Sequence, residues 1–234
     1  MEEDPLVGKR PLIIAHRGFS SRYPENTLAA VHAALDVGVD YVEVDVQETR
    51  DGELVAFHDH RLDRICGVRG RVRDATLARI RSLNAAVPTL EQVLRVCRGK
   101  GRVLIEIKRA DPRKVAALIK RLRMERQAIV FSLSIAWMEM LADADPRIPR
   151  FGLIARNLDG SLRRWCEAVN VEGVGVSRRL VTSRAVVERI HQRGWESFVW
   201  TVNRSAEIER LAAWGVDGII TNHPDRAKSC LARW

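Results

Sequence analysis

Short apolar segments of strand length alternate with segments of helical length along almost the whole 234-residue chain. The strand candidates are residues 11–15, 41–46, 103–107, 128–132, 150–154, 173–177, 197–202 and 217–221. The helix candidates are residues 27–37, 89–98, 112–124, 134–143, 160–169, 183–193, 205–214 and 224–232. This alternation matches the size and rhythm of a (β/α)₈ barrel, the TIM barrel fold. A doubly wound open sheet is the alternative, although no GxGxxG sequence follows the first strand.

Local chemistry at several boundaries supports these helices. Thr89 with Gln92 resembles a capping box, in which each residue bonds the backbone of the other. Asp111 before Pro112 is typical of an N-cap followed by proline at the first helical position. Three glycines stand where left-handed helix ends belong: Gly38, Gly194 and Gly215.

One region, residues 47–88, departs from the alternation. It contains a turn at "RDGE", a short extra strand at 53–57, and an arginine-rich loop that runs up to "VPTLEQ". It is too small for a separate domain. We therefore predict a single domain over 1–234, with its core at about 11–232 and only a short insertion after the second strand.

Composition excludes several classes of protein. No apolar run approaches the ~20 residues that span a bilayer, and the N-terminus "MEEDPLVGKR" lacks the features of a signal peptide. We therefore expect a cytoplasmic protein without stable membrane association. The four cysteines form no CxxC pair, which argues against a zinc finger. The net charge of +9 comes without a nucleic-acid-binding motif, so we expect no nucleic-acid partner.

Acidic residues interrupt two of the apolar strands on one face only. Side chains on a strand alternate with period two, so Glu43 and Asp45 point one way and the neighbouring valines the other. In the third strand, Glu106 and Lys108 share a face opposite two isoleucines. In a barrel, the apolar face meets the helices, and the charged face lies inside near the carboxyl ends of the strands, where active sites form.

Three carboxylates in a confined interior repel one another and lose hydration. Each would take up a proton or destabilise the fold unless a cation compensates. Oxygen ligands suit a hard divalent ion, so we predict that Glu43, Asp45 and Glu106 bind one Ca²⁺ or Mg²⁺. The alternative is that Glu43 and Asp45 pair with interior arginines or with Lys108.

Two histidines flank this predicted metal cluster. His16 follows the first strand, and His58 follows the extra strand behind the acids. A lone histidine is more often structural, but two beside a metal suit a general base and a general acid. Arg17 and Lys108 supply positive charge suited to a phosphate. Trp200 offers an apolar wall for a small organic group, although a core tryptophan is the alternative.

At these residues the sequence resembles the glycerophosphodiester phosphodiesterase family. The matching segments, in the family's order, are "AHRGFSSRYPENTLAA" (15–30), "VEVDVQETRDGELVAFHD" (42–59), "PTLEQVL" (88–94), "IEIK" (105–108), "VWTVN" (199–203) and "GVDGIITNHPD" (215–225). The combination covers nearly the whole chain and is far more specific than any single segment.

The resemblance implies an enzyme that hydrolyses glycerophosphodiesters, its small-molecule substrates, to glycerol 3-phosphate and an alcohol. It implies acid/base roles for His16 and His58, metal positions for Glu43, Asp45 and Glu106, and phosphate contacts for Arg17 and Lys108. In the family mechanism the substrate's own glycerol hydroxyl attacks phosphorus, and water then opens the resulting cyclic phosphate. The sequence does not indicate which histidine is the first base, and it leaves the oligomeric state open.

The chain departs from the family in the region after His58. This region is short, so the larger capping insertion of some relatives is missing, and it is rich in arginine ("RICGVRGRVRD"). Three other functions remain as alternatives: a lysophospholipase D, which needs an apolar groove; a metal-independent phosphoinositide lipase; and a non-catalytic binding barrel. The intact acidic trio argues for a metal-dependent enzyme. No amphipathic segment that could anchor the protein to a membrane is evident, which argues against activity on lipids.

Overall fold

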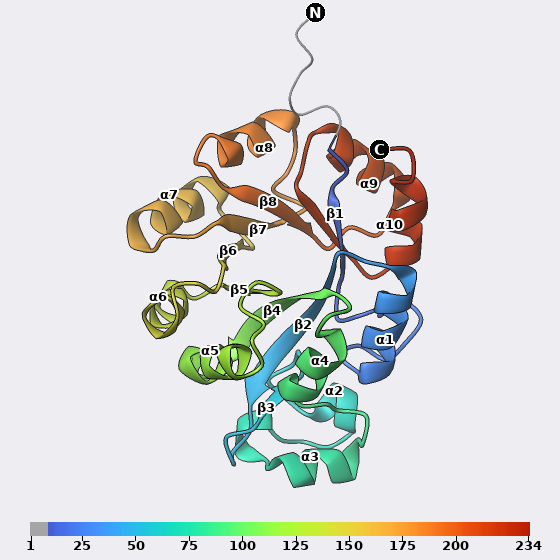
Figure 1. Ribbon diagram of the computed structural model, residues 1–234, viewed down its shortest axis with the longest axis vertical. Helices are drawn as coiled ribbons and strands as arrows, with labels where there is room; N and C mark the ends of the chain where they lie inside the picture. The colour runs from blue at the N-terminus through green and yellow to red at the C-terminus, as the bar shows by residue number, and fades with distance from the viewer. Residues whose placement is uncertain (1–8) are drawn as a thin grey trace, which may run out of the picture.

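Parallel pairing of the first two strands closes a ring of strands that helices surround (Figure 1). The structure is a computed structural model that describes residues 9–234. The strands are β1 (Leu12–Ala15), β2 (Tyr41–Glu48), β3 (Leu54–Ala56), β4 (Arg102–Arg109), β5 (Ala128–Ser132), β6 (Arg150–Ile154), β7 (Gly173–Ser177), β8 (Glu196–Trp200) and β9 (Gly218–Thr221). All are parallel neighbours in the ring except β3, which pairs antiparallel with β2. The predicted TIM barrel is confirmed.

The helices follow the strands in the expected order. They are α1 (Leu28–Val37), α2 (Asp63–Cys66), α3 (Leu77–Leu83), α4 (Leu90–Cys97), α5 (Pro112–Arg121), α6 (Ile135–Ala144), α7 (Leu158–Ala168), α8 (Arg184–His191), α9 (Ser205–Ala213) and α10 (Pro224–Cys230), with a 3₁₀ turn η1 (Val72–Asp74). The capping box at Thr89 and the Asp111 N-cap are both present. The three cap glycines have left-handed φ angles between 74° and 80°.

The two faces of the strands separate in the way that their alternation predicts. Val42, Val44 and Val46 on β2 are fully buried in the large apolar layer between the strands and the helices. A second apolar cluster fills the barrel interior, with Tyr41 and Phe198 among its members. Glu43 and Asp45 are also buried, on the side of β2 opposite the valines. The acids therefore point into the barrel.

The arginine-rich stretch after β3 is more ordered than the sequence indicates. Where we expected a loop, the chain forms α2, η1 and α3, which project together with β3 from one side of the barrel next to α4 (Figure 1). The reason is a small apolar core of its own, made by Val55, Phe57, Leu62, Val72, Ile80 and Val87. These apolar residues stand singly in an arginine-rich stretch, so they form no helical periodicity long enough to predict helices from the sequence.

No helix within residues 9–234 is long and apolar enough to cross a membrane. The expectation about the N-terminus concerns residues 1–10, of which 1–8 lie outside the described part.

Gly18, directly after the Arg17 turn, packs tightly against α1. Its φ is +77°, and a Cβ there would lie 2.6 Å from the carbonyl carbon of Ala30. Gly67 at the end of α2 has a similar φ of +69° but no heavy atom within 4 Å of the same position. The two glycines thus share a backbone conformation and differ in available space.

We expect Gly67→Ala to lower the free energy of unfolding by about 1 kcal/mol, the cost of a left-handed alanine. Gly18→Ala should lower it by a further ~1–3 kcal/mol because the methyl group overpacks the loop against α1. Urea unfolding of both variants measures the difference. Equal losses would show that the contact with Ala30 relaxes at no cost.

Candidate active site

The structure gathers the residues proposed from sequence at the carboxyl ends of the strands. A cavity of about 120 Å³ is lined by seven of the eight: His16, Arg17, Glu43, His58, Glu106, Lys108 and Trp200. The eighth, Asp45, is completely buried beside them and forms ion pairs with Arg17 and Lys108. The segments that carry these residues lie far apart in the sequence, and the closure of the barrel brings them together.

The three acids form one cluster. Glu43 and Asp45 lie two residues apart on β2, and Glu106 is the direct neighbour of Asp45 on β4. Each contributes a carboxylate oxygen, and these oxygens all lie within 4.8 Å of one another. Because the strands are parallel and adjacent, their alternation places all three side chains on the same inner surface.

Two cations lie against these carboxylates. Arg17 Nε is 3.1 Å from Asp45 Oδ2, although it is not aligned for a hydrogen bond. Lys108 Nζ lies 2.6 Å from Glu106 Oε1 and 3.4 Å from Asp45 Oδ1. The pairing of Asp45 with arginine and lysine, considered from sequence as the alternative to a metal, is therefore present. It leaves three carboxylates facing two cations.

The pKa values of the three acids indicate that these two cations offset only part of the negative charge of the cluster. Burial, with Asp45 and Glu106 nearby, raises the pKa of Glu43 well above its ordinary value. Burial and the Asp45 charge raise the pKa of Glu106 to about 7 even against Lys108. Burial acts on Asp45 in the same direction, but Lys108 and Arg17 outweigh it and lower the pKa of Asp45. The cluster thus carries an excess of negative charge that a proton or another cation must balance.

Two buried oxygens in the cluster have no hydrogen-bond partner among the described residues, namely Glu43 Oε1 and Asp45 Oδ1. Glu43 Oε2 accepts a hydrogen bond of 2.7 Å from the backbone N–H of Arg17. Unpaired buried carboxylate oxygens are costly unless a ligand completes them. Oxygen-only donors of this kind fit a hard divalent cation such as Ca²⁺ or Mg²⁺.

His16 is held by the segment that follows β9. Its Nδ1–H donates to Asn222 Oδ1 at 2.6 Å, and Ser20 Oγ donates to the His16 carbonyl at 2.7 Å. This assigns the proton to Nδ1 and leaves the Nε2 lone pair free. Burial and the charge of Arg17 lower the pKa of His16 to about 4, so the imidazole is neutral at pH 7.

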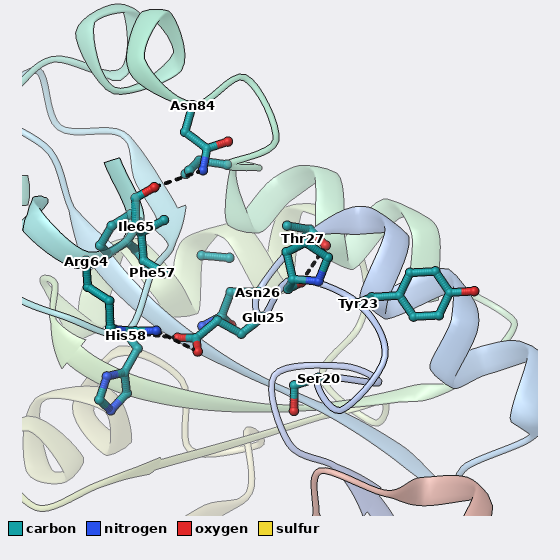
Figure 2. Close-up of a pocket in the computed structure, with 13 residues that line it drawn as sticks. Ser20, Tyr23, Glu25, Asn26, Thr27, Phe57, His58, Arg64, Ile65 and Asn84 are labelled. Atoms are coloured by element: carbon teal, nitrogen blue, oxygen red, sulfur yellow. Dashed lines mark hydrogen bonds and ion pairs between the residues drawn. The ribbon is translucent and has the colours of Figure 1, made fainter. Parts of the chain in front are cut away.

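His58 has a different partner. Its Nδ1–H donates to Asp59 Oδ1 at 2.6 Å, and Arg64 holds the pKa of the Asp59 carboxyl well below its usual range. A carboxylate beside Nδ1 fixes the orientation of the ring so that Nε2 is available. His58 also lines a second cavity of about 380 Å³, which lies between residues 20–27 and the insertion. Figure 2 shows His58 among the residues that line this cavity.

Besides Asn222, two amide side chains that sequence reasoning did not single out hold the site together. Asn26 Nδ2 donates to Asp45 Oδ2 at 2.9 Å, and Asn26 Oδ1 accepts from the Asp45 backbone N–H. Gln47 Nε2 donates to the carbonyls on either side of His58, at Phe57 and Asp59. Gln47 follows Glu43 and Asp45 in the period-two pattern of β2, and that pattern is the signal that could have identified it.

Trp200 forms part of an apolar portion of the cavity wall. The other apolar members of this wall are Phe131, Leu133, Leu153 and Ile220. The indole is only half-buried, and its Nε1 has no hydrogen-bond partner among the described residues. Trp200 is thus positioned at the mouth of the site rather than within the central core.

Comparison with known proteins identifies the family of this chain. The model of the glycerophosphoryl diester phosphodiesterase family matches residues 16–226. A glycerophosphodiester phosphodiesterase from Caldanaerobacter subterraneus is 33% identical over 92% of this chain and 96% of its own.

Solved structures share the fold. A glycerophosphodiester phosphodiesterase from Agrobacterium tumefaciens superimposes with a TM-score of 0.81 at 31% identity, covering 94% of this chain and 99% of the other. An Oleispira antarctica phosphodiesterase in complex with its product sn-glycerol-3-phosphate has a TM-score of 0.84 at 22% identity, covering 95% of this chain and 97% of the other. The chain therefore belongs to the glycerophosphoryl diester phosphodiesterase family and is a hydrolase of phosphodiesters.

Proposed function

We propose that this protein is a metal-dependent enzyme that hydrolyses glycerophosphodiesters to glycerol 3-phosphate and an alcohol, with His16 and His58 as its acid/base pair. One observation carries the proposal: three carboxylates lie within 4.8 Å of one another, and two of them, Glu43 and Glu106, line a cavity together with two imidazoles. The family membership of the chain and the product complex of the Oleispira antarctica protein support it.

Glu43, Asp45 and Glu106 would hold the divalent cation, since Glu43 Oε1 and Asp45 Oδ1 have no hydrogen-bond partner among the described residues. When bound, such an ion lowers the pKa of a coordinated hydroxyl group and neutralises charge on the phosphate oxygens. Arg17 and Lys108 line the same cavity and add positive charge there. Trp200, with the apolar wall around it, contacts the carbon skeleton of the substrate.

In the first step, His16 acts as the base. Its neutral imidazole takes the proton of the glycerol 2-hydroxyl at Nε2, and that oxygen attacks phosphorus. The bond from phosphorus to the alcohol oxygen breaks, and His58 donates the proton that this oxygen needs. A cyclic glycerol phosphate and a free alcohol result. The neutral state of His16 and the Asp59 carboxylate at His58 favour this assignment over the reverse.

In the second step the two histidines exchange roles. His58, now neutral, takes a proton from water, and the water oxygen attacks phosphorus in the cyclic phosphate. The bond from phosphorus to the glycerol 2-oxygen breaks, and the protonated His16 returns its proton to that oxygen. Glycerol 3-phosphate leaves, and both imidazoles are restored to their starting forms.

Glu43→Gln tests the metal site. We expect at least a ~100-fold loss of activity, because a ligand whose charge the ion needs is gone. Ca²⁺ or Mg²⁺ should raise the melting temperature of the chelated wild type but not of the variant. The control is Glu48→Gln on the same strand, whose carboxylate pairs with Lys114 away from the cluster. Full activity of the wild type in the presence of a chelator would contradict metal dependence.

A substrate with a good leaving group tests the histidine roles. The p-nitrophenyl ester of glycerol 3-phosphate releases an alcohol that needs no proton to depart, so an acid catalyst matters little. His58→Ala should lose about 100-fold or more in kcat on glycerophosphocholine but much less on the nitrophenyl ester. His16→Ala should be impaired on both, since both need a base. The opposite pattern would reverse the assignment.

A further inference from the structure

Arg64, in the insertion, links the part of the site that carries His58 to the part that carries Arg17. Its guanidinium lies between two carboxylates, with Nε 2.6 Å from Asp59 Oδ2 and Nη2 2.6 Å from Glu25 Oε1. Two further hydrogen bonds make both contacts bidentate, at 3.1 Å to Asp59 and 2.9 Å to Glu25. Figure 2 shows Arg64 reaching from the insertion to Glu25, with His58 close by.

Each of the two carboxylates also contacts a residue of the active site. Asp59 Oδ1 accepts the His58 Nδ1–H at 2.6 Å. Glu25 Oε1 accepts from Arg17 Nη1 at 3.0 Å, and the same Arg17 contacts Asp45. A continuous series of charge-assisted contacts therefore runs from His58 through Arg64 to Arg17. Such bidentate bonds restrict orientation more than single contacts do.

Arg64 is itself placed by the small core of the insertion. The residues beside it on the chain, Leu62 and Ile65, belong to or pack on that core. The Arg64 side chain is 48% exposed, so its ion pairs add little to the free energy of unfolding. Their effect lies in orientation, because among the described residues the Asp59 carboxylate without Arg64 keeps only its contact with His58, and that of Glu25 only its contact with Arg17.

We propose that Arg64 is a positioning residue that fixes His58 through Asp59 and Arg17 through Glu25. The insertion, by this inference, completes the catalytic machinery rather than only covering it. The proposal rests on the proposed function. It is tested by comparing the activity of variants with that of the wild type, so its failure can be told apart from failure of the proposed function.

Arg64→Met should lower kcat by about 10- to 100-fold, the usual loss when a group that orients a catalytic side chain is removed. Divalent-ion affinity and melting temperature should stay close to wild type, because Arg64 contacts none of the three acids. Arg64→Lys should recover only part of kcat, since an ammonium cannot bond two carboxylates in bidentate fashion. Arg61→Met is the matched control, because Arg61 lies in the same insertion and, among residues 9–234, forms its ion pair with exposed Asp63.

A second readout is independent of turnover. The hydrogen-bonded Nδ1–H proton of His58 should give a downfield NMR signal that Arg64→Met weakens and Arg61→Met preserves. If Arg64→Met fails to fold, Asp59→Asn and Glu25→Gln test the two arms separately. A folded Arg64→Met protein with wild-type kcat, or with an unchanged His58 signal, would overturn the proposal. An inactive wild type would instead overturn the proposed function.

A different feature lies on the other side of Trp200. A cavity of about 530 Å³ at the ends of β6, β7 and β8 is lined by Trp200 and Thr201, which also line the catalytic cavity. Three arginines line it as well, Arg156, Arg178 and Arg179, and no acidic residue does. The backbone N–H of Arg178 donates to the Trp200 carbonyl at 2.8 Å, which ties this loop to the mouth of the site. We refer to this cavity as the arginine pocket.

The charges of the arginine pocket are only partly neutralised. Arg178 pairs with Glu207 on α9 at 3.1 Å. Among the described residues, neither Arg156 nor Arg179 lies within ion-pair distance of an acid. Exposed unpaired arginines next to an anion-binding site attract a second negative group on the same ligand. Because Trp200 lines both the arginine pocket and the catalytic cavity, we infer that the arginine pocket is a subsite for glycerophosphodiesters that carry an additional carboxylate or phosphate.

Two substrates that differ by one carboxylate test this subsite: glycerophosphoserine and glycerophosphoethanolamine. The kcat/KM for glycerophosphoserine divided by that for glycerophosphoethanolamine should fall by about 5-fold in the double variant Arg156→Gln/Arg179→Gln. This is the change expected for loss of two exposed ion pairs. The rate on glycerophosphoethanolamine should hardly change. The control is Arg163→Gln/Arg164→Gln, which removes the same charge from an exposed stretch of α7 outside the pocket.

Binding to His58→Ala gives the same comparison without turnover. Calorimetric dissociation constants for the two ligands should differ in the His58→Ala protein and converge when Arg156 and Arg179 are also replaced. An unchanged ratio, or equal effects in the control, would overturn the subsite and reduce the arginines to general surface charge. Absence of turnover on both substrates would count against the proposed function, and binding would still decide on the subsite.

Discussion

The structure of this site depends on one electrostatic constraint, the burial of three carboxylates within 4.8 Å of one another. Arg17 and Lys108 offset part of their charge, but burial and the neighbouring carboxylates still raise the pKa values of Glu43 and Glu106. A buried cluster of this kind stabilises nothing by itself, since desolvation and repulsion both oppose it. It persists because the surrounding barrel packing supplies the free energy, and it is therefore best understood as a binding site for positive charge.

Around this cluster, neutral amide side chains orient the acids and the histidines through hydrogen bonds. Asn26 bonds both the side chain and the backbone of Asp45, Asn222 sets the tautomer of His16, and Gln47 holds the chain on both sides of His58. Amides add directional hydrogen bonds without adding charge, which suits a place where charge is already in excess. The charged Arg64 contacts lie further out, where the side chains are partly exposed and water screens them.

Much of the fold and the membership of the site could be predicted from the sequence. Strand alternation alone separates Glu43 and Asp45 from the valines around them, and the rhythm of eight strands and helices indicates a barrel. The barrel then requires that residues at the carboxyl ends meet, although their segments are far apart. The short helices α2 and α3 could not be predicted, because a core of single apolar residues has no period.

Residue type and period therefore determined the barrel, the inward direction of the acids and the identity of the candidate site residues. Tertiary structure alone decided the partners of those side chains: Asn222 beside His16, Asp59 beside His58, and Arg64 between Asp59 and Glu25. The physical reason is that alternation is a local property of the backbone. A hydrogen bond or ion pair depends instead on positions fixed to within about 0.5 Å, and these follow only when all the elements have packed together.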